Sequence, residues 1–229
     1  MTTNVGPDIE RSVLQDVQAD REYKVTVVAV GVYENSSPVE MTCATSTPPP
    51  EDFRATDVTE TSITVSWKLR TNSLAIGHRV WITRSDTAEN LFTQFVASGQ
   101  TYVIFDHLSP ATEYMISATS INRYNEGPET SLTVATRTDS PMALDVVHKT
   151  TNSVLISWLP PKAALTAYNI TYTKEGRGLR TSIMLSGDVD NCEVTGLIPG
   201  TRYDIELVAV SRFGRSLAAS TSFVTGTYT

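Results

Sequence analysis

The sequence has no run of about 18 consecutive apolar residues, so no part of it is long enough to cross a bilayer as a helix. It contains only 18 Lys and Arg against 25 Asp and Glu, which gives a formal net charge of −7. This acidic balance excludes a surface for nucleic acid or anionic membranes, because such partners need a basic field. The N-terminus also lacks the basic start and apolar centre of a secretory signal peptide. If the parent protein is secreted, we expect this chain to be an internal piece.

Cysteine and histidine are scarce, with 2 and 3 residues respectively. Cys43 and Cys192 occupy non-equivalent positions far apart in the chain, so we do not expect their Cα atoms to come within the roughly 7 Å that a disulfide needs. Each is expected to face a core as a small hydrophobic residue. His78, His107 and His148 lie on separate segments without the spacing of a metal site or catalytic triad. The sequence therefore predicts no catalytic residue, no cofactor and no metal site.

What the chain does contain is a repeat of about 90 residues. Tyr23, Tyr114 and Tyr203 begin three segments that superimpose without a gap, at spacings of 91 and 89 residues. Trp67 and Trp158 recur 91 residues apart. A repeat of this length with alternating patterns inside it predicts a tandem array of small β modules.

Within each repeat the apolar residues alternate with polar ones. Ile63, Val65 and Trp67 are separated by Thr64 and Ser66, and the stretch that ends at Trp158 has the same alternation with Leu155 and Ser157 between its inward residues. Such alternation predicts antiparallel strands with one buried face, and Gly- and Pro-rich turns separate them. About seven short strands per repeat without helical periodicity predict an all-β fold of two-sheet sandwiches.

The order of these motifs resembles the fibronectin type III module. The C-terminal repeat carries it nearly complete, as Ser157-Trp-Leu-Pro-Pro161, Tyr168-Asn-Ile-Thr-Tyr172 and Gly196-Leu-Ile-Pro-Gly-Thr-Arg-Tyr203. The repeat before it carries Trp67, His78-Arg-Val-Trp-Ile82, where tyrosine is usual, and Leu108-Ser-Pro-Ala-Thr-Glu-Tyr114. The resemblance implies tandem immunoglobulin-like β-sandwiches, with module two at residues 48–138 and module three at residues 139–229.

Four aromatic residues have an expected structural role in these modules. Trp67 and Trp158 should be buried between the two sheets, where truncation to alanine costs roughly 3–5 kcal/mol. Tyr114 and Tyr203 stand where a tyrosine corner would tie a strand to the preceding turn through its hydroxyl.

Residues 1–47, called the N-terminal unit below, align only with the second half of a module. Met41-Thr-Cys-Ala-Thr45 matches Leu132-Thr-Val-Ala-Thr136, but no tryptophan strand precedes it. We expect three strands, the C-terminal strands of a partial fibronectin type III unit. Three strands cannot close a sandwich, so strand edges should stay exposed and the unit should be poorly ordered unless it docks elsewhere.

Two triplets match the acceptor sequence for N-glycosylation, Asn35-Ser-Ser37 and Asn169-Ile-Thr171. Asn35 falls on an expected loop. Asn169 alternates with apolar neighbours and should point away from the core. We expect both to be accessible, which favours an extracellular location.

The loop before the last strand of each module is a candidate surface for protein partners, because loops on a rigid sandwich are natural recognition sites. In module two the candidate contacts are Arg123 and Tyr124, and in module three they are Arg212 and Arg215. The alternative is local packing, since an aromatic residue recurs there in every repeat.

Trp81 is a further candidate, because it alternates out of phase with its apolar neighbours and should lie on an outer sheet face. An exposed tryptophan can mark a contact surface. The alternative is that it packs on the stem of Arg79 or Arg84.

These observations predict a non-catalytic segment for protein–protein interaction or spacing. The resemblance includes ectodomains of receptor-type tyrosine phosphatases and tenascin-like matrix or adhesion proteins, and implies protein ligands or neighbouring modules as partners of a monomeric segment. The Pro-containing linkers, Thr45–Pro50 and Arg137–Pro141, predict an extended, semi-rigid rod. The alternatives are an intracellular array in a filament-associated protein and a spacer in a bacterial secreted enzyme.

Overall fold

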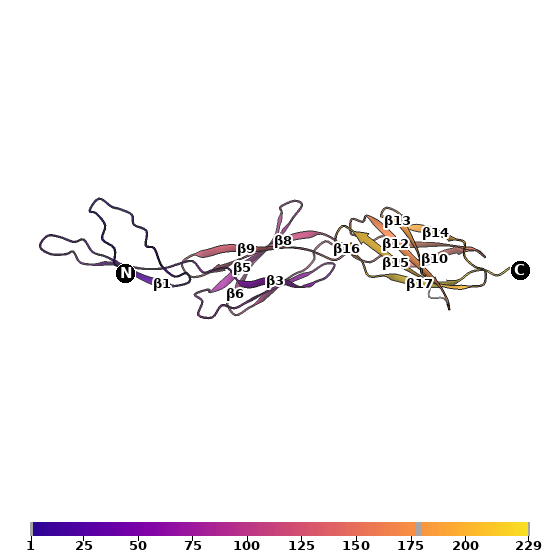
Figure 1. The fold of residues 1–229 in the computed structure, drawn as a ribbon, viewed down its shortest axis with the longest axis horizontal. Coiled ribbons are helices and arrows are strands. Elements are labelled where there is room, and N and C mark those ends of the chain that lie inside the picture. Colours follow the sequence, from indigo (N-terminus) through magenta and orange to yellow (C-terminus); the bar gives the residue numbers. More distant parts are fainter. Residues whose placement is uncertain (1, 177–179, 229) are drawn as a thin grey trace.

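The structure is a computed structural model that describes residues 2–176 and 180–228. Its regular elements are the strands β1 to β17, arranged as three successive units along one axis (Figure 1). The all-β fold expected from the alternating sequence is confirmed. No helix in the described ranges is long and apolar enough to span a bilayer.

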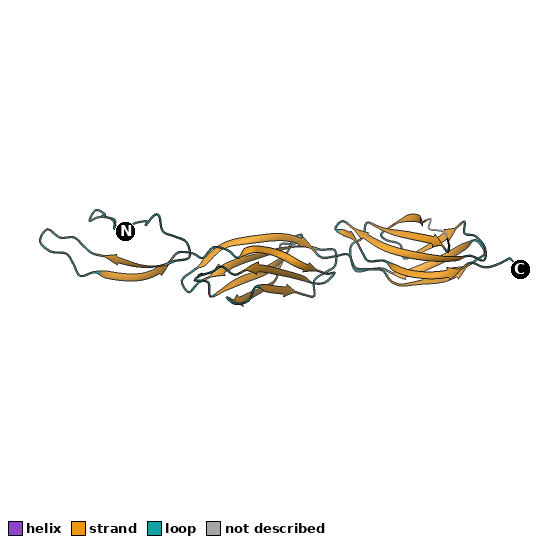
Figure 2. Ribbon diagram, turned by 60° about the horizontal axis from the view of Figure 1, so that its bottom comes forward, coloured by secondary structure: helices purple, strands orange, loops and turns teal. Residues whose placement is uncertain are grey.

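Module two is a sandwich of a three-stranded and a four-stranded antiparallel sheet (Figure 2). The first sheet has the order β3-β4-β7, formed by Glu51–Val58, Ile63–Lys68 and Tyr102–Phe105. The second has the order β6-β5-β8-β9, formed by Asn90–Ala97, Gly77–Arg84, Glu113–Ile121 and Glu126–Ala135.

Module three repeats this arrangement. Its first sheet has the order β10-β11-β14, formed by Met142–Lys149, Ser153–Leu159 and Asn191–Thr195. In its second sheet β13 (Arg180–Ser186), β12 (Ala167–Lys174) and β15 (Arg202–Ser211) follow one another. Strand β15 also pairs with β16 (Gly214–Arg215) and β17 (Ala219–Val224).

Each sandwich encloses its own core, with a tryptophan packed edge-on against one aromatic ring. Trp67 lies 5.4 Å from the imidazole of His78 in module two, and Trp158 lies 5.1 Å from the ring of Tyr168 in module three. Both tryptophans are buried. His78 thus fills the place of a core tyrosine. Burial lowers the pKa of His78, because a charged imidazole would be poorly solvated there.

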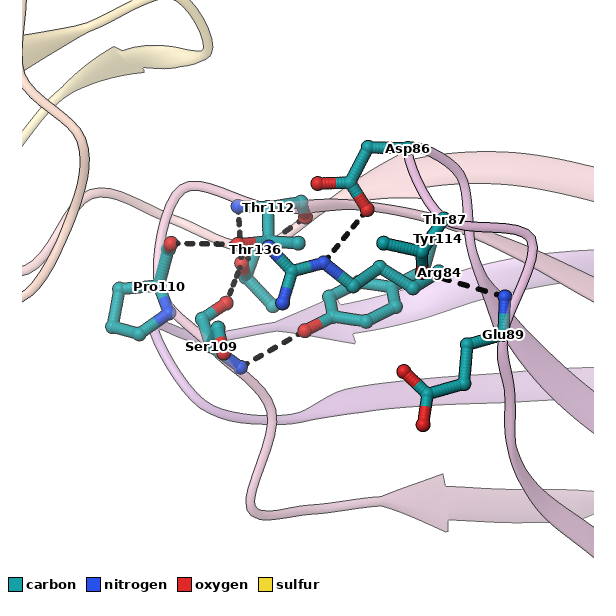
Figure 3. Close-up of polar contacts among 9 residues, drawn as sticks. All are labelled: Arg84, Asp86, Thr87, Glu89, Ser109, Pro110, Thr112, Tyr114 and Thr136. Atoms are coloured by element: carbon teal, nitrogen blue, oxygen red, sulfur yellow. Dashed lines mark hydrogen bonds and ion pairs between the residues drawn. The ribbon is translucent and has the colours of Figure 1, made fainter.

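A tyrosine hydroxyl ties the turn to the strand in each unit, and Figure 3 shows the one in module two. Tyr114 Oη accepts the Ser109 N–H at 2.9 Å, and Tyr203 Oη accepts the Ile198 N–H at 3.1 Å. Tyr23 makes the same bond to a main-chain N–H five residues earlier, at 2.8 Å. The corner therefore forms even in the incomplete unit, because it needs only residues close in sequence.

A threonine directly after the neighbouring strand closes the same corner. In module two, Thr136 Oγ1 donates to the Ser109 carbonyl oxygen at 2.7 Å and accepts the Thr112 N–H at 3.0 Å (Figure 3). Thr225 and Thr45 make the equivalent pairs of bonds in the other two units.

The N-terminal unit contains two strands, β1 (Glu22–Val27) and β2 (Val39–Ala44), not the three expected. In the modules, the strand equivalent to the missing one is β7 or β14, which pairs with the tryptophan strand β4 or β11. The N-terminal unit has no tryptophan strand to pair with, so the segment that contains Leu14 and Val17 stays irregular.

Candidate functional site

The N-terminal unit meets module two at a buried carboxylate. Asp20 is only 5% exposed, and its Oδ1 accepts hydrogen bonds from Thr47 Oγ1 at 2.9 Å and from the Leu74 N–H at 3.0 Å. Burial works against ionisation of Asp20, but the hydrogen bonds from Leu74, Ser73 and Thr47 outweigh it and lower its pKa. Asp20 thus fastens the N-terminal unit to the β4–β5 loop of module two.

Asn122 carries this network into the hairpin loop of module two, residues 122–125 between β8 and β9. Its Nδ2 donates to Thr47 Oγ1 at 3.1 Å and to the Thr45 carbonyl oxygen at 3.3 Å. Its Oδ1 accepts the main-chain N–H groups of Tyr124 and Asn125, at 2.8 and 2.9 Å. Asn122 therefore shapes its own loop and binds the linker with the same side chain.

Gly127 lets the linker approach. A Cβ atom built on Gly127 would overlap the carbonyl oxygen of Thr47. Any other residue there would push the linker away from the start of β9.

Two of the predicted partner contacts, Arg123 and Tyr124, are engaged by the N-terminal unit. Arg123 Nη2 lies 2.6 Å from Glu22 Oε2, and Tyr124 Oη donates to the same oxygen at 2.9 Å. The guanidinium also lies over the Tyr124 ring, 5.1 Å from its centroid. The local packing given as the alternative therefore occurs, together with a contact to the N-terminal unit that was not expected, although exposed ion pairs of this kind add little stability.

Module three meets module two through an equivalent but simpler contact. Thr138 is 2% exposed, its Oγ1 lies 2.7 Å from Ser211 Oγ, and it donates to the Gly214 carbonyl oxygen at 3.2 Å. Ser140 Oγ donates to the Leu217 carbonyl oxygen at 3.0 Å. Ser211 takes the place that Asn122 has in the first junction, because Ser211 Oγ also accepts a loop N–H, that of Phe213, at 3.1 Å.

The other two predicted loop contacts, Arg212 and Arg215, remain exposed. The guanidinium of Arg212 lies 4.3 Å from the centroid of the Phe213 ring. The two arginines keep their charged groups in water.

Trp81 lies on the outer face of the four-stranded sheet and is half-buried. The Arg79 guanidinium lies 5.5 Å from its ring centroid and also pairs with Glu126 at 2.5 Å. Arg84, the other arginine considered for this contact, instead bonds Asp86 at 2.7 Å (Figure 3). Trp81 is therefore partly covered by its own module.

The two glycosylation triplets differ in accessibility. Asn35 is exposed in the loop between β1 and β2. Asn169 lies in the central strand β12 and is half-buried, and its Oδ1 is covered and without a hydrogen-bond partner among the described residues. The free accessibility expected for both sites therefore applies to Asn35 and not to Asn169, because the neighbouring strands β13 and β15 flank it.

The remaining reactive side chains do not converge. Cys43 and Cys192 are free and half-buried, and burial raises the pKa of the Cys192 thiol. Residues 2–176 and 180–228 contain no cluster of three or more His, Cys, Asp or Glu that could hold a metal ion.

The linker threonines and Asp20 were not predicted from the sequence. Thr47 and Thr138 are 91 residues apart, the same spacing as the tryptophans, so the repeat itself carried the signal. Their role depends on a neighbouring unit, which alternation within one module does not reveal.

Comparison with known proteins agrees with the fold and its repeat. The sequence model of the fibronectin type III domain matches residues 48–137 and 139–225. Mouse tenascin is 27% identical over 233 residues, covering 99% of this chain and 11% of tenascin. Mouse tenascin-R is 30% identical over 214 residues, covering 93% of this chain and 16% of tenascin-R. The chain thus spans a small part of these relatives.

A solved segment of two fibronectin type III domains from chicken tenascin superimposes with a TM-score of 0.64 at 22% identity, covering 77% of this chain and 99% of that segment. At this identity the likeness supports the fold alone. The family match covers both complete sandwiches, and the resemblance seen in the sequence is confirmed. The chain belongs to the fibronectin type III family.

Proposed function

We propose that this chain is a non-catalytic spacer and interaction segment of an extracellular matrix or adhesion protein. The proposal rests on the hydrogen bonds that join each unit to the next at the two junctions. At each one a buried linker threonine, Thr47 or Thr138, binds the hairpin loop of the following module. A linker held in this way fixes the direction of one module relative to the next, which is what a spacer needs.

The extracellular part of the proposal rests on the similarity to tenascins and on the exposed triplet at Asn35. Protein ligands would meet surfaces that the junctions leave open. Arg212 and Arg215 offer exposed positive charge for an acidic partner, and Trp81 offers a partly covered aromatic ring.

Small-angle X-ray scattering of the whole chain tests the spacer. The pair-distance distribution should be that of an elongated particle with the units in line (Figure 1). The double variant Asn122→Ala, Ser211→Ala removes one hydrogen-bonding side chain from each junction and should shorten the mean end-to-end distance, because the units then bend freely. The control Thr133→Ala changes an exposed side chain of β9 and should leave the curve unchanged. The proposal would be contradicted if the wild-type pair-distance distribution were the same as that of the double variant.

Secretion from eukaryotic cells behind an added signal peptide tests the location. The intact mass should fall on glycosidase treatment, and Asn35→Gln should remove most of that difference. Asn169→Gln should matter little because Asn169 is half-buried. An efficiently secreted chain without glycan would give equal weight to the alternative, an intracellular structural array.

A further inference from the structure

The repeat contains a third copy of the linker threonine at the end of module three. Each unit ends in Thr-x-Thr, at Thr45 to Thr47, Thr136 to Thr138 and Thr225 to Thr227, again 91 and 89 residues apart. The first threonine of each pair closes the tyrosine corner of its own unit. The second is buried against the next module at Thr47 and Thr138, each 2% exposed, whereas Thr227 is exposed.

The main chain that leads to Thr227 follows the same path as at the two occupied junctions. In each unit the residue between the two threonines accepts a main-chain hydrogen bond from the turn before the corner tyrosine. These bonds run from Asp20 to Ser46 at 3.1 Å, from Ala111 to Arg137 at 3.0 Å and from Gly200 to Gly226 at 3.0 Å.

The turn residue itself has the same backbone conformation in all three units. The φ angles of Asp20, Ala111 and Gly200 are 58°, 45° and 61°. In module three the Gly226 N–H also donates to the Thr150 carbonyl oxygen at 2.8 Å, as the Arg137 N–H donates to the Thr59 carbonyl oxygen at 2.9 Å in module two. The main chain at the end of module three therefore has the same geometry as at the two junctions.

The two occupied junctions define the partner that this end would accept. Asn122 donates a hydrogen bond to the linker hydroxyl, and Ser211 shares one with the linker hydroxyl in which either oxygen can donate. Both side chains also accept a main-chain N–H from their own loop. Asparagine and serine have both functions in one short side chain, whereas aspartate lacks the donor and alanine lacks both.

We propose that the C-terminal end of module three, formed by Gly200, Gly226 and Thr227, is a docking site for a further fibronectin type III module whose hairpin loop begins with asparagine or serine. The proposal rests on the proposed spacer function and adds the chemistry by which one junction selects the next module.

A chain extended by one module tests this site. Residues 1–227 are followed directly by a second copy of residues 139–229, so that Thr227 stands before Asp139 of the copy as Thr138 does in the native chain. Residual dipolar couplings give an alignment tensor for each module. Module three and the copy should share one tensor, as modules two and three should.

Two variants of the extended chain test the hydroxyl. Thr227→Ala should give the copy a tensor of its own without a change in the melting temperature of either module, and Thr227→Ser should restore the shared tensor. Ser220→Ala, on the exposed face of β17, is the matched control and should change nothing.

The possible outcomes separate the two proposals. Suppose that modules two and three share a tensor. If the copy then has a tensor of its own, or if Thr227→Ala leaves a tensor shared by module three and the copy unchanged, the proposed docking site is wrong but the spacer function is not contradicted. If modules two and three are themselves independent, the spacer is wrong and the docking site with it.

Discussion

Replacing Tyr114 with phenylalanine removes one hydroxyl from module two and leaves the buried ring in place. Tyr114 is 1% exposed, so the apolar area that it buries should not change. The loss is the hydrogen bond that its Oη accepts from the Ser109 N–H at 2.9 Å. The substitution therefore isolates the contribution of the corner bond from that of core packing.

The loss of stability depends on the surroundings of the Ser109 N–H, which is left without its partner. A buried donor left without a partner costs about 1–3 kcal/mol. Ser109 is itself exposed, so water can approach, and the lower end of about 1 kcal/mol applies. For a domain of this size, that free energy lowers the melting temperature by roughly 4–8 °C.

Amide-resolved nuclear magnetic resonance during thermal unfolding follows each module separately. Tyr114→Phe should lower the melting temperature of module two only, and Tyr203→Phe that of module three only. Tyr102→Phe makes the same chemical change at a half-exposed position of β7 and should have no effect. An unchanged module two in Tyr114→Phe, or an equal loss in both modules, would show that the corner hydroxyl does not act as described.

Three further changes test other parts of the structure. Trp158→Ala should destabilise module three by roughly 3–5 kcal/mol and unfold it while module two stays folded, as measured by urea denaturation of each module. Trp81→Ala should cost less than about 1 kcal/mol, because it removes mainly the Arg79 contact on an outer face; unfolding of module two would place Trp81 in the core. Because the pKa of Asp20 in the folded junction lies below its ordinary value of 3.8, its contribution is complete above that pH and is lost as the pH falls through the folded pKa. The Leu74 amide signal should report this titration, and Asp20→Asn should abolish it.

The sandwiches could be predicted from the sequence because their determinants are local. Alternation placed Trp67 and Trp158 on inward faces, and both tryptophans are buried in the structure. The corner tyrosines form their bonds to a residue five positions earlier, so a short motif was sufficient.

The junctions could not be predicted in the same way, because they depend on residues far apart in sequence. The bond from Asn122 to Thr47 spans 75 residues, and the ion pair of Arg123 with Glu22 spans 101. A hydroxyl in a Pro-rich linker or a carboxylate in a turn usually contacts water. Only the neighbouring unit gives Asp20 and Thr47 a buried environment.

The position of the termini within each sandwich determines how the array carries tension. In module three the first strand, β10, lies against the last, β17, and in module two β3 lies against β9, so the chain enters and leaves each sandwich through neighbouring strands. The modules follow one another along the long axis of the array (Figure 2). In module three, a pull on both ends would therefore act along β10 and β17. The ladder bonds that join β10 to β11 and β17 to β15 would share the load instead of breaking one after another. Such a sandwich should hold until most of these bonds fail together, and then lengthen in one step.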